Sequence, residues 1–372
     1  MAKSAKARKA KRIREHKARE KTRRETRRDG ARKVDGLAEA RAVLTRALVP
    51  SRERIDVRIE EARAFERWRV DPSPPEDGSS IALDDSGEWQ GELRELVSDS
   101  LVFDHALFPA MAAADNLTTV VAAVDEWDGT GVTRSISVIA LCRAVMEAAS
   151  RTIWVLSSED RDERRDRALR ITKDEVLRQK KFAEALSVGE GTEGCDDGLA
   201  RCKKVLDELD NASVRGAQTM EQMIVLAAGW VDENAPNRDN RPMGEHVLAM
   251  YSITSGVAHG HTWPTRYLTD PNSLFSVIAD SLYVAVTLLG AAVVLYEAQA
   301  TATGNIGSKC PATLRDAARL MYPRYAPGAS GLTPFRRSSR YESRPVARGR
   351  GQGDWSDHDE QQEASHPGAG RP

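Results

Sequence analysis

The sequence predicts an all-α protein, a multi-helix bundle with a basic N-terminal arm and a disordered C-terminal tail. Three observations support that class. Apolar residues recur at helical spacing through most of the chain. No stretch alternates apolar and polar residues with the period of two that a half-buried strand requires. No internal repeat indicates a solenoid or a propeller.

Charge is divided unevenly along the chain. Seven Lys and nine Arg against four acidic residues give residues 1–34 a formal net charge of +12, although the whole chain carries −1. Ile13 is the one large apolar residue of this arm before Val34, so we expect a disordered segment or a solvated helix. With the tail over 331–372 at +1, the body over 35–330 carries −14. Contact with RNA or DNA phosphates is therefore assigned to the arm, and a solubilising role or docking on the acidic body are its alternatives.

A helical pair is predicted over residues 35–70. Its two amphipathic stretches cover 37–48 and 55–68, and Ile55 and Ile59 lie on one side of the second stretch. Pro50 and the residues around it separate the two stretches. Prolines, acids and small residues then dominate residues 71–90, which is typical of a linker.

The core domain is expected over residues 91–326, followed by the disordered tail over 327–372. Its predicted helices cover 93–114, 116–127, 135–156, 157–186, 199–209, 219–231, 242–258, 273–299 and 311–321. We expect Pro109 to interrupt the first of these helices and residues 128–131 to form a turn. The most apolar helices, 135–156, 242–258 and 273–299, are expected to form the centre of the core.

Cap and loop signals separate these helices. Thr219 and Gln222 have the spacing of a capping box, and Pro242 suits the first position of a helix. Asn272 or Ser273 is expected to cap the next helix. The glycine-rich residues 188–198 are predicted to be a flexible connection, because no strand precedes them and their acidic side chains repel phosphate.

The longest apolar run is residues 281–296, bounded by Asp280 and Glu297. A membrane span needs about 20 apolar residues, so we interpret this run as a buried core helix and expect no membrane association. The four cysteines show no metal-ligand spacing, and no apolar stretch follows the basic start as an export signal requires. We therefore expect a cytoplasmic protein with no metal and no other cofactor.

Two rows of polar side chains stand on otherwise apolar helices. The first row, at positions i, i+4 and i+8, is Arg143, Glu147 and Arg151. The second row, with the same spacing, is Tyr251, Ser255 and His259. Buried charges cost several kcal/mol unless they are paired, so the two rows are expected to face each other or a shared cleft. The functional interpretation is a site for an anionic ligand or partner, and a purely structural network is the alternative.

The segment from Arg241 to His246, Arg-Pro-Met-Gly-Glu-His, resembles the signature of HEPN-type ribonucleases. In those small all-α proteins an Arg and a His cut RNA without a metal, at a site that usually forms across a homodimer. The resemblance implies that His246 moves a proton from the ribose 2′-hydroxyl while Arg241 stabilises the phosphorane.

A second resemblance concerns Tyr251-Ser-Ile-Thr-Ser-Gly-Val-Ala-His-Gly260, taken together with the helix that carries Arg143 and Glu147. This pattern is similar to that of a family of actinobacterial all-helical proteins with no established activity, over residues 130–298. It implies a fold and a lineage but no catalytic residue. The sequence therefore favours a non-enzymatic binding protein, with a ribonuclease and an arm that contacts nucleic acid as alternatives.

Overall fold

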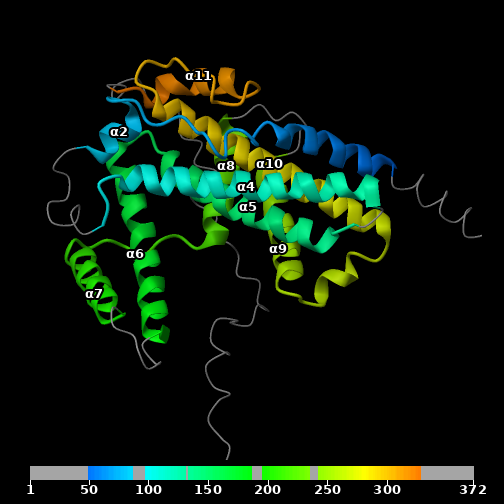
Figure 1. Cartoon of the computed structure of the whole chain (residues 1–372), viewed down its shortest axis with the longest axis horizontal. Helices are drawn as coiled ribbons and strands as arrows, with labels where there is room; N and C mark the ends of the chain where they lie inside the picture. Colours follow the sequence, from blue (N-terminus) through cyan, green and yellow to red (C-terminus); the bar gives the residue numbers. More distant parts are fainter. Residues whose placement is uncertain (1–48, 87–96, 131–132, 187–194, 235–241, 328–372) are drawn as a thin grey trace, which may run out of the picture. The chain divides into compact units, whose positions relative to one another are not determined.

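The computed structural model confirms the all-α class (Figure 1). It describes residues 49–86, 97–130, 133–186, 195–234 and 242–327. Within these ranges every regular element is a helix, and all of them belong to one packed unit. The predicted arm, the stretch over 37–48 and the tail from 328 onward lie outside the described residues.

One unlabelled helix covers residues 49–63 and continues as turns to residue 70. The remaining elements are α2 (Ser80–Asp85), α4 (Leu101–Thr130), α5 (Ser135–Leu156), α6 (Arg161–Leu186), α7 (Cys195–Asn211), α8 (Met220–Asn234), α9 (Met243–Ala258), the 3-10 helix η1 (Trp263–Arg266), α10 (Pro271–Ala300) and α11 (Arg315–Tyr325). Ile55 and Ile59, expected on one side of this helix, are buried together with Ala62.

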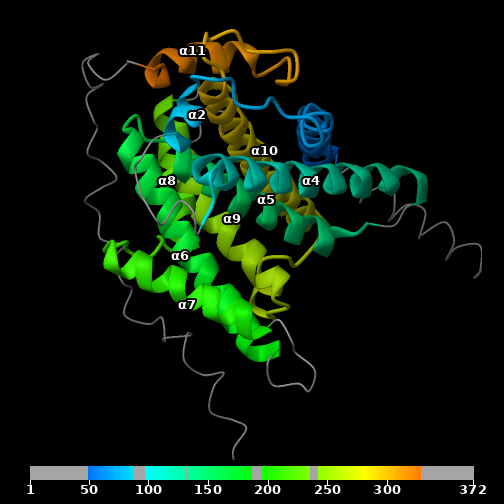
Figure 2. The ribbon, with the colours of Figure 1, turned by 60° about the vertical axis from the view of Figure 1, so that its left-hand side comes forward.

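Helices α5 and α10 form the centre of the unit. Helix α5 packs against α4, α8, α9 and α10, and α10 also contacts α4 and α11. Figures 1 and 2 show α11 lying across one end of α10, and α7 lying beside α6. By length and composition alone, α10 and residues 101–127 of α4 are each able to cross a membrane, although neighbouring helices bury most of α10. Core helices of soluble proteins meet the same criteria.

Helix α4 runs without interruption through Pro109, so the expected break, the separate helix over 116–127 and the turn from 128 are wrong. Proline removes one helical hydrogen bond and crowds the preceding turn, at a cost of about 3 kcal/mol. Against that cost, α4 buries Ala106, Ala110 and Leu117 in the core and packs along α5. Tertiary packing therefore outweighs the local preference of proline.

Residues 71–86, expected as part of a linker, instead pack against α10. The buried carboxylate of Glu297 accepts hydrogen bonds from Trp68 Nε1 at 2.7 Å and from Ser73 Oγ at 2.8 Å. The hydroxyl of Tyr296 donates to the carbonyl of Ser73 at 2.7 Å. Polar residues that resemble a solvated linker in sequence here satisfy polar groups of a core helix.

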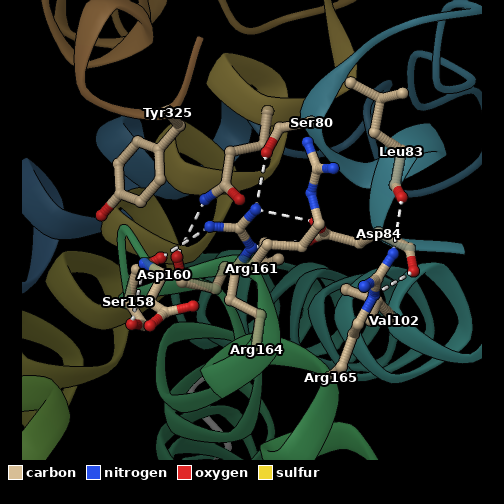
Figure 3. A network of polar contacts seen from close by, with 12 residues as sticks. Ser80, Leu83, Asp84, Val102, Ser158, Asp160, Arg161, Arg164, Arg165 and Tyr325 are labelled. Atoms are coloured by element: carbon tan, nitrogen blue, oxygen red, sulfur yellow. Dashed lines mark hydrogen bonds and ion pairs between the residues drawn. The ribbon is translucent and has the colours of Figure 1, made fainter. Parts of the chain in front are cut away.

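A buried ion pair joins α2 to α6 (Figure 3). The guanidinium of Arg164 donates from Nε and Nη2 to the two carboxylate oxygens of Asp84, at 2.6 and 2.8 Å. Its Nη2 also donates to Ser80 Oγ at 2.9 Å, and its Nη1 donates to the carbonyl of Ser158 at 2.9 Å. Both charged side chains are almost completely buried. Burial raises the pKa of Asp84, and the positive charge of Arg164 opposes that rise.

Three carboxylates cap helices. Asp85 accepts hydrogen bonds from the amides of Val102 and Phe103, at 2.8 and 3.1 Å, and so caps α4. Asp232 caps α9 in the same way, and Asp270 rather than Asn272 or Ser273 caps α10. The predicted capping box of Thr219 and Gln222 is present at the start of α8.

The cap of α4 predicts a pH dependence of stability. Burial raises the pKa of Asp85 to about 6, above the value of about 4 that an aspartate has in an unfolded chain. The folded state therefore binds this proton more tightly than the unfolded chain does. The resulting contribution to the free energy of unfolding is fully present below pH 4 and is lost as the pH rises through 6. We expect the free energy of unfolding of Asp85→Asn, relative to the wild type, to rise by about 2 kcal/mol over this interval.

Urea denaturation at pH 4, 5, 6 and 7 measures this difference. Asp125→Asn, which removes an exposed carboxylate paired with Arg63, is the control variant. A difference between wild type and Asp85→Asn that stays constant from pH 4 to 7 contradicts the prediction.

Candidate functional site

The two predicted polar rows meet where α5 contacts the end of α9. Arg143 Nη1 lies 2.8 Å from Nε2 of His259, although 116 residues separate them in sequence. Arg143 Nε donates to Glu147 Oε1 at 2.8 Å, and the hydroxyl of Tyr251 donates to the same oxygen at 3.2 Å. We call these four residues the Arg143 cluster.

The Arg143 cluster lies at the edge of the bundle rather than in its interior. The side chain of Arg143 is 17% exposed and that of Glu147 is 30% exposed, and His259 is an exposed residue. Helix α9 ends at Ala258, so His259 belongs to the C-cap, where its amide donates to the carbonyl of Ser255. The cluster is therefore accessible to a ligand.

Two residues of the predicted rows take no part in the cluster. Ser255 is half-buried, and its backbone carbonyl accepts the hydrogen bond from the amide of His259 that ends α9. Arg151 pairs with Glu175 of α6, at 3.5 Å. Eight residues along a helix cover about 12 Å, so Arg151 lies beyond the reach of α9 and meets a different neighbour of α5. The residues of the first row thus contact two different helices, α9 and α6.

The guanidinium of Arg143 is held in a defined orientation. Its Nε is bonded to Glu147, and its Cζ lies 5.5 Å from the ring centroid of Tyr251, in a cation–π contact. Burial raises the pKa of Tyr251, and the negative charge of Glu147 acts in the same direction. The phenol therefore stays protonated and donates to Glu147 at neutral pH.

An exposed aromatic loop continues from the cluster. Trp263 is 39% exposed and Tyr267 is 64% exposed, and their ring centroids lie 6.1 Å apart in an edge-on arrangement. The rings of His259 and His261 are 6.0 Å apart. A Cβ atom on Gly256 would lie 2.6 Å from Cζ2 of Trp263, so the loop packs on α9 only because residue 256 is glycine. The sequence reasoning missed these aromatic residues, whose signal is their position in an otherwise polar loop.

His246 lines a separate groove of about 480 Å³ between the helix over 49–63, α9 and α10. Arg54, which pairs with Asp280, and Arg58, whose Cζ lies 4.9 Å from the ring centroid of Tyr283, line the same groove. Arg241, the other predicted catalytic residue, lies outside the described residues. The structure therefore places one half of this predicted pair.

The side chains that the structure describes include neither a group of metal-ligating residues nor an accessible cysteine thiol. No group of three or more His, Cys, Asp and Glu side chains in the described ranges is arranged to hold a metal ion. Cys142, Cys202 and Cys310 are buried free thiols, and burial raises the pKa of Cys142 and Cys310 to about 12. Thiols of this kind are poor nucleophiles at neutral pH.

No protein-family model matches the chain, and comparisons with curated proteins and with solved structures give no significant match. The resemblances to HEPN-type ribonucleases and to the actinobacterial family stay predictions from the sequence. A functional proposal for this chain therefore depends on the geometry of its sites.

The exposure of the Arg143 cluster predicts a moderate role in stability. We expect Glu147→Ala to lower the free energy of unfolding by about 1–2 kcal/mol, because the substitution removes two hydrogen bonds but leaves Arg143 in contact with solvent. Tyr251→Phe, which removes one of these hydrogen bonds, is expected to cost about 1 kcal/mol or less. Chemical denaturation measures both. A loss above about 3 kcal/mol for Glu147→Ala contradicts this account and indicates a fully buried network.

Proposed function

We propose that this chain is a binding protein for a phosphate-bearing ligand, and that the ligand binds at the Arg143 cluster. The contact between Arg143 and His259 carries the proposal. A guanidinium only donates hydrogen bonds, so Nε2 of His259 must accept and the ring proton resides on Nδ1. The exposed His259 then offers a second donor beside the positive charge of Arg143, as recognition of a phosphate requires.

The surroundings favour a nucleotide or a single-stranded oligonucleotide. Trp263 and Tyr267 are partly exposed aromatic side chains close in sequence to His259, and Arg266 of the same loop is exposed. Stacking of a base on an aromatic side chain contributes about 1–3 kcal/mol and tolerates any base. Arginine and histidine donors beside aromatic faces form a combination that suits the phosphates and the bases of one strand.

Titration with a fluorescein-labelled oligouridine, followed by anisotropy at low salt, tests the proposal. We expect Arg143→Met and Trp263→Ala each to weaken binding about tenfold, a loss of about 1.4 kcal/mol. Arg178→Met, which removes an exposed arginine of α6, and Phe108→Ala, which removes an exposed aromatic residue of α4, are the matched controls. Both controls are expected to bind within twofold of the wild type.

Unchanged affinity in Arg143→Met and Trp263→Ala contradicts the proposal. If binding is also lost on deletion of residues 1–34 and falls steeply with salt, the basic arm is the nucleic-acid-binding element. That result would favour the alternative in which the folded body serves as a scaffold.

A metal-independent ribonuclease is the second candidate, and the position of His246 in a groove with Arg54 and Arg58 favours it. In this reaction the 2′-hydroxyl attacks the adjacent phosphate while His246 takes its proton, and an arginine stabilises the charge on the phosphate oxygens. The P–O5′ bond then breaks to give the 2′,3′-cyclic phosphate, and the departing 5′-oxygen takes a proton from water to leave as a 5′-hydroxyl. The amides at the start of α9 are already bonded to Asp232 and cannot also bind a phosphate. The arginines of the groove would therefore stabilise the negative charge of the phosphate.

This candidate predicts cleavage of single-stranded RNA to 2′,3′-cyclic phosphate products in the presence of EDTA. We expect His246→Ala to lower the rate at least a hundredfold, the usual contribution of a general base. Product analysis by gel electrophoresis and mass spectrometry measures it. Absence of cleavage by the wild type, or equal cleavage by His246→Ala, excludes the ribonuclease.

A further inference from the structure

A second cavity lies between α4, α6 and α7, away from the residues of the Arg143 cluster. Its volume is about 540 Å³. Apolar side chains, Val97, Leu101, Val176 and Val205, form much of the lining. His105 of α4 and Glu175 of α6 bring polar groups into this apolar surrounding.

Hydrogen bonds around Thr172 define the tautomer of His105. The hydroxyl of Thr172 donates its single hydrogen to the carbonyl of Ala168, at 3.1 Å. When the hydroxyl makes this bond, the histidine is the donor in the 2.8 Å contact between His105 Nε2 and Thr172 Oγ1. In that arrangement the proton resides on Nε2 and Nδ1 presents a lone pair, an assignment that the NMR experiment below tests. Burial lowers the pKa of His105 to about 4, which keeps the ring neutral at physiological pH.

The bare Nδ1 of His105 faces a second acceptor. Oε2 of Glu175 lies 3.9 Å away, too far for a direct hydrogen bond. The other oxygen of this carboxylate, Oε1, lies 3.5 Å from Arg151 Nη1. Two acceptors thus lie side by side, and one donor atom with two hydrogens, placed beside the pair, can bond to both.

We propose that this cavity binds a small primary amine with an apolar body, whose ammonium group bridges Nδ1 of His105 and Oε2 of Glu175. An alcohol has one hydrogen and cannot satisfy both acceptors, whereas an ammonium group has three. Glu175 and Asp104 bring two carboxylates to the lining, against one arginine, Arg201. Arg151 lies near Oε1 of Glu175, which leaves Oε2 for the ammonium group. The apolar lining accommodates the hydrocarbon part of the ligand.

NMR of the full chain labelled with ¹⁵N at histidine tests the proposal, with the His105 signals assigned from the spectrum of His105→Gln. We expect Nε2 to carry the proton in the free protein. Titration with 2-phenylethylamine is expected to shift the Nδ1 signal of His105, and 2-phenylethanol, the matched alcohol, is expected to bind at least tenfold more weakly. Both ligands are titrated into the wild-type protein, and His105→Gln serves only for the assignment.

Substitutions then assign the contact. Glu175→Gln is expected to weaken binding of the amine at least tenfold, and Asp174→Asn, a change at the neighbouring carboxylate that pairs with Arg178, is expected to stay within twofold. A proton on Nδ1, equal affinity for amine and alcohol, or no response of His105 to the amine overturns the proposal.

Discussion

The buried ion pair between Arg164 and Asp84 is the interaction on which the arrangement of the helices depends. Two charges in a protein interior cost several kcal/mol each unless their partners are complete. Here the guanidinium satisfies both oxygens of Asp84 and also donates to Ser80 and to the carbonyls of Ser158 and Glu159. One side chain therefore joins α2, the turn between α5 and α6, and the first turn of α6.

The same contact sets the position of α4 relative to α6. Asp84 is followed by Asp85, which caps α4 through the amides of Val102 and Phe103, so the two adjacent carboxylates attach to two different helices. The cavity that contains His105 and Glu175 is lined by these two helices and by α7. The positions of His105 and Glu175 relative to each other thus depend on how Asp84 and Asp85 connect the starts of α6 and α4.

Helix α5 relates the two sites. It packs against five neighbouring helices, α4, α6, α8, α9 and α10, and its polar row lies partly exposed between them. Glu147 and Arg143 meet α9, and Arg151, two turns later, meets α6. Because the residues of this row contact different helices, one row of polar residues contributes to both the Arg143 cluster and the surroundings of Glu175.

The sequence predicts correctly those elements that depend on the spacing of apolar and polar residues within one segment. The bounds of α5 match the prediction, and Arg143 and Glu147 contact the second row as expected, although Arg151 and Ser255 take no part in that contact. The continuity of α4 through Pro109 and the packing of residues 71–86 were out of reach, because tertiary contacts with α5 and α10 decide them. The environment of His105 was missed for the same reason, since its partners Thr172 and Glu175 are 67 and 70 residues away on another helix.

A double-mutant cycle on the ion pair tests the central claim most directly. The free energies of unfolding of Asp84→Leu, Arg164→Met and the double variant are measured by urea denaturation. If the pair organises the helix ends, each single substitution costs about 3–5 kcal/mol, and the double variant is more stable than the sum of the two losses predicts by at least about 2 kcal/mol. Losses that simply add contradict the account, because the two side chains would then act independently.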